Sequence, residues 1–185
     1  MKKAIFLMVL LVLASSAFAQ FRGIDWGVTI DEVKQSETAE LLAEDPEYLV
    51  YSDTIGGLSA HVYYLFHNGK FFRGTYSFNE RHSQKNMFID DYYKINSLLK
   101  EKYGEPKAEK IMWLNDLYRD DKDEYGFAVS LGHLKYYSDW ETDDITIRNI
   151  LAGDNYEINH LIFYEYKPLS EQQSEARKEE AKDKL

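Results

Sequence analysis

The residues that could hold a metal ion are scattered along this chain. His61 and His67 share one face of an expected strand, but six residues at about 3.3 Å each place them roughly 20 Å apart, too far for one ion. The other three histidines, His82, His133 and His160, are isolated in the sequence. We therefore expect no metal site.

Residues for other kinds of catalysis are equally hard to find. The chain has no cysteine, no serine in a Gly-x-Ser-x-Gly turn, no Ser-x-x-Lys motif accompanied by its partner sequences, and no glycine-rich phosphate loop. The acidic runs at residues 120–124 and 139–144 lack the spacing of a calcium-binding loop, and a solvated loop is the simpler interpretation. We expect no cofactor and favour a protein without catalytic activity, with a minor hydrolase as the alternative.

Aromatic residues stand out instead, with 15 Tyr, 10 Phe and 3 Trp. Most should be strand and core residues, because aromatic side chains suit a half-buried pleated surface. Neighbours on a strand face opposite ways, so Tyr136 and Tyr137 cannot both enter one core. Since Tyr and Trp are frequent at the centres of binding interfaces, we take Tyr136, Tyr137 and the nearby Trp140 as candidate binding residues. The alternative is that they are ordinary sheet residues.

The first nineteen residues read as an export signal. Lys2 and Lys3 precede an apolar run at residues 4–14, and residues 15–19 end in the small-x-small pattern that signal peptidase accepts. Eleven apolar residues are too few to cross a bilayer, which needs about 20, so we expect no retained membrane anchor. Cleavage would leave a mature chain that begins at Gln20 and enters the periplasm or the medium.

The net charge of the mature chain restricts the classes of partner that we expect for it. Without the two leader lysines, 20 basic face 32 acidic side chains, a net charge of −12. A charge of this sign repels phosphate backbones, which argues against nucleic acid as a partner. The absence of cysteine also removes any disulfide framework and any lipid-modified cysteine, so a single apolar core must hold the mature chain together.

The first half of the mature chain predicts a short strand at residues 21–26 and then a helix. Thr29 and Glu32 have the spacing of a capping box for a helix that begins at Ile30. Residues 37–47 are expected to form a short helical turn or a loop. Residues 48–79 predict three strands in a meander, with tight turns at Gly56-Gly57 and Asn68-Gly69.

The second half predicts a long helix followed by four strands. Apolar residues recur every three to four positions from Phe88 to Leu99, and Gly104 and Pro106 supply the stop. The expected strands are residues 108–114, 125–136, 145–151 and 156–166, with a turn at 153–155 and another at 138–140. After Pro168 the composition becomes charged and almost free of apolar residues.

These elements predict an α+β fold of antiparallel meander sheet, with one long and one short helix packed on one face. The order helix then meander occurs twice, which suggests a degenerate duplication. We expect one domain at residues 20–168 and a charged tail at residues 169–185, partly helical or disordered.

Two short motifs carry a resemblance to known proteins. Residues 27–33 (Gly-Val-Thr-Ile-Asp-Glu-Val) resemble the Gly-x-Thr-x-x-x-Val helix start of small exported bacterial proteins of the SmpA/OmlA (BamE-like) and β-lactamase-inhibitor-like type. Residues 103–106 (Tyr-Gly-Glu-Pro), followed by Trp113, are similar to the Leu-Gly-x-Pro segment and downstream Trp of that group. The two motifs lie farther apart here, and the lipid-bearing cysteine of the assembly lipoproteins is missing. A looser similarity is to uncharacterised exported proteins with a Phe-x-Gly-Ile-x-Trp-Gly start.

The resemblance implies helices on an antiparallel sheet and a role in envelope assembly or in inhibition by protein binding. Our leading expectation is a non-catalytic exported protein that binds another envelope protein through an aromatic-bearing sheet face. The alternative is a small-ligand or glycan binder, or a minor periplasmic hydrolase. The sequence does not specify the oligomeric state.

Overall fold

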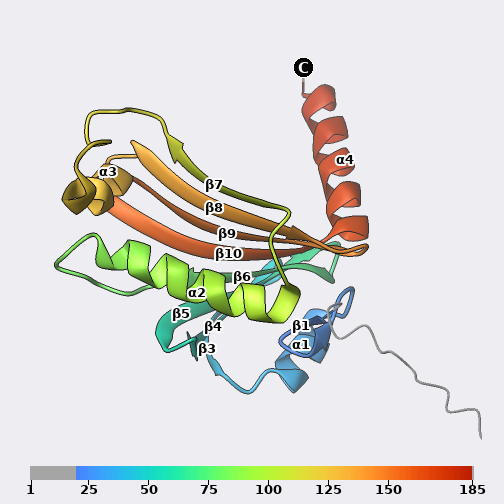
Figure 1. The fold of residues 1–185 in the computed structure, drawn as a ribbon. Coiled ribbons are helices and arrows are strands. Elements are labelled where there is room, and N and C mark those ends of the chain that lie inside the picture. Colours follow the sequence, from blue (N-terminus) through green and yellow to red (C-terminus); the bar gives the residue numbers. More distant parts are fainter. Residues whose placement is uncertain (1–19, 185) are drawn as a thin grey trace, which may run out of the picture.

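A single antiparallel sheet of eight strands dominates the computed structural model, which describes residues 20–184 of the 185-residue chain. The strands lie in the order β3-β4-β5-β6-β10-β9-β8-β7, and β1 and β2 form a separate two-stranded sheet (Figure 1). The expected α+β class with an antiparallel sheet is therefore confirmed. The expected leader, residues 1–19, lies outside the described residues.

The bounds of the elements are as follows. The strands are β1 Gln20–Phe21, β2 Ile24–Asp25, β3 Glu40–Asp45, β4 Tyr48–Ile55, β5 Leu58–His67, β6 Lys70–Phe78, β7 Ala108–Trp113, β8 Leu134–Glu141, β9 Ile145–Asp154 and β10 Glu157–Tyr166. The helices are α1 Ile30–Ser36, α2 Met87–Tyr103, α3 Tyr125–Ser130 and α4 Lys167–Asp183, with a 3₁₀ turn, Lys122–Glu124, before α3.

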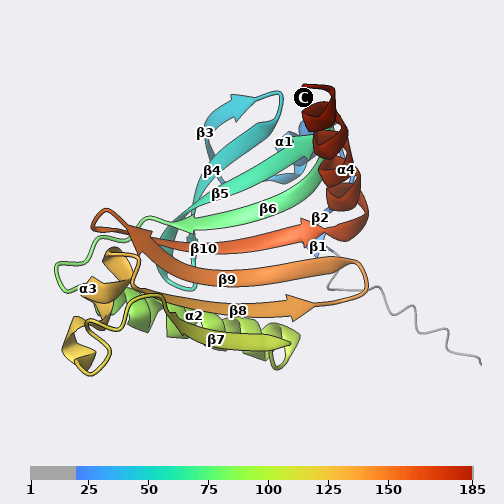
Figure 2. The same cartoon turned by 90° about the horizontal axis from the view of Figure 1, so that it is seen from above.

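The sheet consists of two four-stranded meanders that meet at its centre. β3 to β6 form one meander and β7 to β10 the other, and β10 pairs with β6 in antiparallel register (Figure 2). The helix α1 precedes the first meander and α2 precedes the second. The last strands of the two meanders are therefore the central strands, while β3 and β7 are the two edges.

Local sequence signals placed several elements correctly. Thr29 caps α1, and the side chain of Glu32 returns to the Thr29 backbone, which is the expected capping box. Asn68 and Gly69 both have positive φ, 50° and 71°, in the turn between β5 and β6. Gly104 ends α2 with φ 79°. Each of these positions needs a particular backbone conformation, and that is why the sequence reveals it.

Four expectations were wrong. Residues 21–26 do not form one strand, because a turn with positive φ at Arg22 and Gly23 separates β1 from β2. Residues 37–47 contain the strand β3 rather than a helical turn or a loop, and β3 is exposed on both faces, so it has no alternation of apolar residues to reveal it. Residues 125–130 form α3 instead of the start of a strand. The expected turn at residues 138–140 lies inside β8, where Ser138 and Trp140 are buried.

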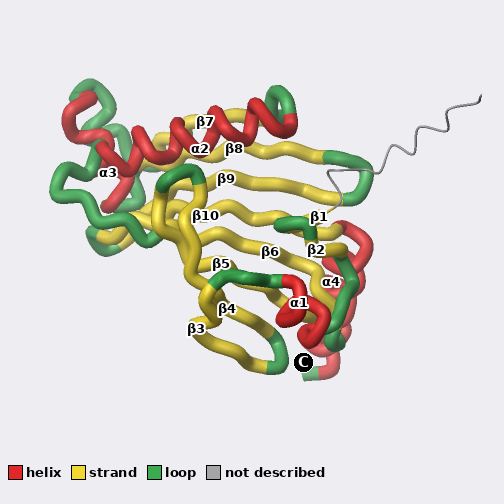
Figure 3. The backbone as a smooth tube through the Cα atoms, turned by 90° about the horizontal axis from the view of Figure 1, so that it is seen from below, coloured by secondary structure: helices red, strands yellow, loops and turns green. Residues whose placement is uncertain are grey.

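The long helix α2 packs across one face of the sheet. Its buried residues are Ile89, Tyr92, Ile95, Asn96 and Leu99, and it contacts β9 and β10. The Tyr92 hydroxyl lies 2.8 Å from the Ser138 hydroxyl in β8. Figure 3 shows α1, α2 and the β1–β2 hairpin on the same side of the sheet. The apolar core lies between these elements and the sheet.

The charged C-terminal segment forms α4, which begins with Pro168 in its first turn. It contacts β6 and β10 near its start and then rises from the side of the sheet opposite α2 (Figure 1). Among residues 20–184, no helix has the length and apolar composition needed to cross a membrane. The position of α4 makes it a wall at one end of the face that α2 leaves uncovered.

Candidate binding face

Alternation along β8 separates the two faces of the sheet. Tyr136, Ser138 and Trp140 are buried toward α2, whereas the intervening Tyr137 and Asp139 are partly exposed on the opposite face. We call this opposite surface the open face. Over β7 to β10 it is formed mainly by Lys110, Met112, Lys135, Tyr137, Asp139, Thr146, Arg148, Ile150, Leu161, Phe163 and Glu165.

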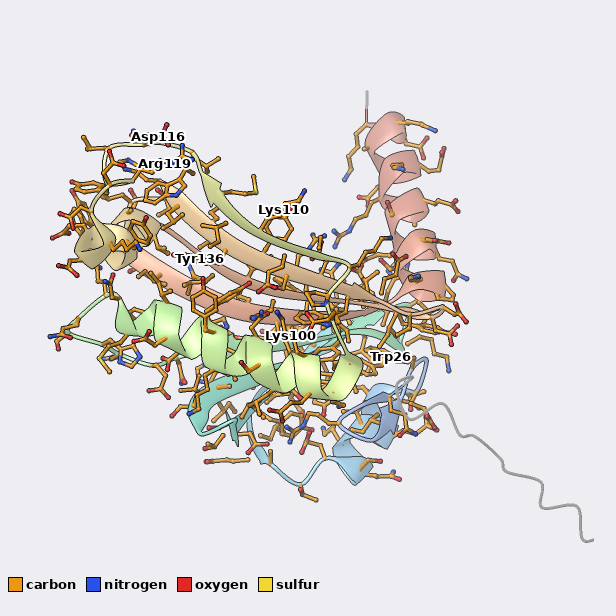
Figure 4. All side chains as sticks on the ribbon, in the orientation of Figure 1. Trp26, Lys100, Lys110, Asp116, Arg119 and Tyr136 are labelled. Atoms are coloured by element: carbon orange, nitrogen blue, oxygen red, sulfur yellow. The ribbon has the colours of Figure 1, made fainter. Side chains whose placement is uncertain are left out.

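Two of the three expected binding residues belong to the core. Tyr136 and Trp140 are only 2% and 3% exposed. The ring of Tyr136 packs against Tyr92 and Tyr93 of α2, and Figure 4 shows Tyr136 between the sheet and this helix. Burial raises the pKa of Tyr136 above its ordinary value. The expected exposed set of Tyr136, Tyr137 and Trp140 is therefore not present, because the three side chains lie on both faces of one strand.

Trp140 has a specific structural role. Its indole Nε1 donates a hydrogen bond of 2.8 Å to the carbonyl oxygen of Gly104, at the C-terminus of α2. A buried indole N–H needs such a partner, and a helix end leaves carbonyl groups without one. Trp140 thus fixes the end of α2 on the sheet.

Tyr137 is the one candidate that lies on the open face. It is partly exposed, and the ammonium group of Lys110 in β7 lies 5.9 Å from its ring centroid. A cation over an aromatic ring at this distance is weakly attracted to it. Tyr137 can therefore contact a partner.

A shallow groove of about 580 Å³ crosses the open face. Partly exposed Ile150 and Phe163 form its apolar floor, and charged side chains from four strands surround them. The charged residues of the groove are Arg73, Lys107, Asp139, Glu141, Arg148 and Glu165. An apolar centre with a polar border is the usual arrangement of a protein-binding surface.

The groove carboxylates are all held in ion pairs. Arg148 forms two bonds to Asp139, of 2.6 and 3.0 Å, and Arg73 lies 2.7 Å from Glu165. Burial opposes ionisation of Glu165, but hydrogen bonds from Ser170 and Arg73 nevertheless lower its pKa below the ordinary value. Glu165 is therefore ionised at neutral pH and is a poor proton donor.

Glu141 lies between two lysines at the end of the groove. Lys167 is 2.8 Å from its carboxylate, and Lys107 forms a second ion pair with it. Hydrogen bonds from Lys107 and Lys167 lower the pKa of Glu141 to about 2. The carboxylate therefore stays charged at neutral pH. No group of three or more potential ligands for a metal ion occurs in the part of the chain that the structure describes.

The groove and the adjoining side of α4 carry local positive charge in an acidic chain. Five cationic and three carboxylate side chains line this surface, a local charge of +2 against −10 for the whole chain. They are Arg73, Lys107, Arg148, Arg177 and Lys178 against Asp139, Glu141 and Glu165. Sequence reasoning missed these residues, although Arg148 and Ile150 lie two positions apart in an expected strand and therefore share one face.

A second charged cluster ties the N-terminal segment to the sheet. Arg22 forms two bonds to Glu37, of 2.8 and 3.1 Å, and one of 2.6 Å to Asp53. The hydroxyl of Tyr64 donates to Glu37 at 2.5 Å. The side chain of Glu37 is only 4% exposed, so a ligand cannot reach it in this conformation. We interpret the cluster as structural.

This cluster predicts a loss of stability in acid. Burial of Glu37 opposes ionisation of its carboxyl group, but hydrogen bonds from Arg22 and Tyr64 lower the pKa of Glu37 from 4.5 to about 2. A lowered folded-state pKa gives stability that is present above the unfolded value and is lost as the pH falls from about 4.5 toward 2. Glu37→Gln should cost about 2 kcal/mol at neutral pH and reduce the acid sensitivity in that window. Thermal unfolding of both proteins as a function of pH checks this, and parallel pH profiles would contradict it.

The remaining buried polar groups also have structural roles. A chain of hydrogen bonds runs through Asn149: its Nδ2 donates to Asn96 Oδ1 of α2 at 3.3 Å, and its Oδ1 accepts from His160 Nε2 of β10 at 2.9 Å. Burial lowers the pKa of His160 to about 3, so this histidine is neutral at ordinary pH. The chain lies under α2 and away from the groove, and we assign it to the docking of helix on sheet.

Comparisons with protein-family models, with curated proteins and with solved structures gave no match.

Proposed function

We propose that this chain is exported and binds another protein of the cell envelope through the open face. The leader at residues 1–19 would direct export, and no membrane anchor would be retained. The burial of Phe21 supports this cleavage site, because a cut beyond Phe21 would remove a core residue. The proposed localisation is the periplasm or the medium.

The observation that carries this proposal is the groove on the uncovered side of the sheet. Its apolar floor, its ion-paired border and the α4 wall form a surface over β7 to β10 that no helix of residues 20–184 covers. The local charge of +2 favours a partner surface that carries carboxylates, since complementary charge steers association and rejects wrong partners. Tyr137 would contribute an aromatic contact at the side of this surface.

The repeated order of helix and four-stranded meander supports a proposal about the origin of the fold. We infer that the two halves arose by duplication, with the short helix α1 and the long helix α2 as equivalent elements on one face of the sheet. We also keep the kinship with the SmpA/OmlA and β-lactamase-inhibitor-like proteins as a proposal, based on the helix-cap motifs at residues 27–33 and 103–106. Both agree with a role in protein binding.

The alternatives of a small-ligand or glycan binder and of a minor hydrolase have no specific support in residues 20–184. The groove is shallow, and every carboxylate that lines it has a cationic partner. An enzyme that uses carboxyl groups as acids needs a raised pKa in at least one of them. In this groove the pKa values of Glu141 and Glu165 are lowered.

Capture from envelope extract tests the proposal when it is made with matched variants. Arg148→Glu reverses a charge at the centre of the open face, and Lys94→Glu makes the same change on the exposed side of α2. The immobilised wild type and Lys94→Glu should retain the same partner, and Arg148→Glu should retain it at least about tenfold less well, a loss of about 1.4 kcal/mol.

Two outcomes would contradict this function. If no protein is retained while a small molecule raises the melting temperature of the wild type, the ligand-binding alternative is correct. Equal capture by Arg148→Glu and Lys94→Glu would place the partner elsewhere on the molecule.

A further inference from the structure

The edge strand β7 leaves backbone groups unpaired. It is the last strand in the sheet and, within residues 20–184, pairs only with β8 (Figure 2). The amide of Leu114 donates to the carbonyl of His133 at 2.7 Å, directly beyond the end of the ladder. Because hydrogen-bonded pairs alternate along an antiparallel ladder, Lys110 and Met112 also bond toward β8, and Glu109, Ile111 and Trp113 direct their N–H and C=O groups outward.

Exposed apolar side chains also lie along this edge, on both faces of the strand. Of the eleven large apolar residues exposed among residues 20–184, four lie between positions 111 and 117 and are 40–70% exposed. They are Ile111, Met112, Leu114 and Leu117. Exposed Tyr93 of α2 packs beside them on Tyr136, the β8 neighbour of Ile111.

The other edge of the sheet is protected. β3 carries Glu40, Glu44 and Asp45, and its register with β4 shifts between Leu41 and Ala43. Charges and bulges are the usual devices that prevent pairing between edges. β7 pairs with β8 without such a shift, and no charged residue occurs from Ile111 to Leu114.

We propose that a second copy of this chain pairs with β7 through its own β7, around a two-fold axis at Met112. Only Glu109, Ile111 and Trp113 direct their backbone groups toward a partner strand. In any register that forms hydrogen bonds, each of these odd-numbered residues must therefore lie opposite an odd-numbered residue of the partner. An axis at Lys110 would place two lysines opposite each other, and an axis at Ile111 would place Trp113 opposite the partner's Glu109. An axis at Met112 pairs Ile111 with the partner's Trp113 and Met112 with the partner's Met112.

The self-complementary register favours a second copy as the occupant, because the strand sets its own apolar residues opposite each other. In an antiparallel pair, the acidic loop after β7 lies toward the end of the partner strand that holds Glu105, Lys107, Glu109 and Lys110, a segment without net charge. Figure 4 shows Lys110 on β7, and Asp116 and Arg119 in that loop. Each acidic loop begins at Asn115, and the two copies of this residue are six positions apart along the interface, or about 20 Å. This distance exceeds the screening length of about 10 Å.

This dimer would leave the proposed function intact. The two-fold axis of an antiparallel pair is perpendicular to the sheet, so both open faces lie on the same side of one continuous sheet. The dimer goes beyond the proposed function and does not depend on it, because β7 pairs through its edge and the groove lies on the face.

A single cysteine tests the pairing directly, because the chain has none of its own. In the proposed register the two copies of residue 112 are a non-hydrogen-bonded pair with Cα atoms about 4.5 Å apart, within the range of a disulfide. Met112→Cys should form a covalent dimer on mild oxidation. Leu41→Cys, on the protected β3 edge and similarly exposed at 41% against 40%, should stay monomeric. A Met112→Cys protein that stays monomeric, or equal cross-linking of both variants, would overturn the proposal.

Sedimentation equilibrium of the mature chain supplies a second test without cross-linking. Ile111→Pro removes one outward N–H and leaves the bonds to β8 in place, which an edge strand tolerates. The wild type should dimerise, and Ile111→Pro should raise the dissociation constant by about tenfold or more. Should Ile111→Pro lose its near-ultraviolet circular dichroism, Ile111→Lys replaces it, with the same shift expected. A wild type that stays monomeric up to its solubility limit refutes the proposal.

Discussion

Phe21→Ala is expected to lower the free energy of unfolding by about 3–5 kcal/mol. Phe21 is 1% exposed, and its ring contacts the rings of Tyr64, Tyr76 and Tyr164 at centroid distances of 5.0–5.3 Å. Removal of this ring leaves a cavity between the β1–β2 hairpin and the central strands. Chemical denaturation of the mature protein measures the loss.

Gly74 supplies the matched control for this prediction. A Cβ atom at position 74 would lie 2.5 Å from the ring of Phe21, so the ring occupies space that only glycine leaves free. Gly74→Ala alone should cost about 1–3 kcal/mol, because the ring must move. In the Phe21→Ala background the same change should cost much less. Additive effects of the two substitutions would contradict the packing described above.

Trp140→Ala should also destabilise the fold by about 3–5 kcal/mol. This residue is buried and joins β8 to the end of α2 through the Gly104 carbonyl. Trp140→Phe keeps an aromatic ring but removes the donor, so a cost of about 1–3 kcal/mol is expected. Thermal and chemical unfolding of the two variants measure these losses.

Tyr137→Ala provides the contrast on the same strand. It is partly exposed on the open face, so its stability cost should stay below about 1 kcal/mol while capture of the partner weakens. If Trp140→Ala left stability unchanged, or if Tyr137→Ala cost as much as Trp140→Ala, the assignment of the two faces of β8 would be wrong.

The sequence predicted elements whose signals are local. The Thr29 cap, the Asn68-Gly69 turn and the Gly104 stop each reflect a backbone conformation that few residues adopt. The strand β3 was missed because both of its faces are exposed. The helix α3 was missed because Phe127, Val129 and Leu131 alternate as in a strand, and nothing local reveals the packing of α3 on the start of α2.

The candidate site was harder to predict because it depends on which face α2 covers. Tyr136 and Trp140 are an even number of positions apart, so a strand that contains both must place them on the same face, opposite Tyr137. That parity argued against a single patch of three residues. The groove itself joins Arg73 of β6 to Glu165 of β10, residues far apart in the sequence whose meeting only the sheet order determines.

Photo-cross-linking in cells that export the protein tests the binding role of the open face most directly. A photoreactive residue at Ile150, in the floor of the groove, is compared with one at Lys94, on the exposed side of α2. We expect a discrete adduct with one envelope protein from position 150 and none from position 94. No adduct from position 150, or the same adducts from both positions, would contradict a binding role for the open face.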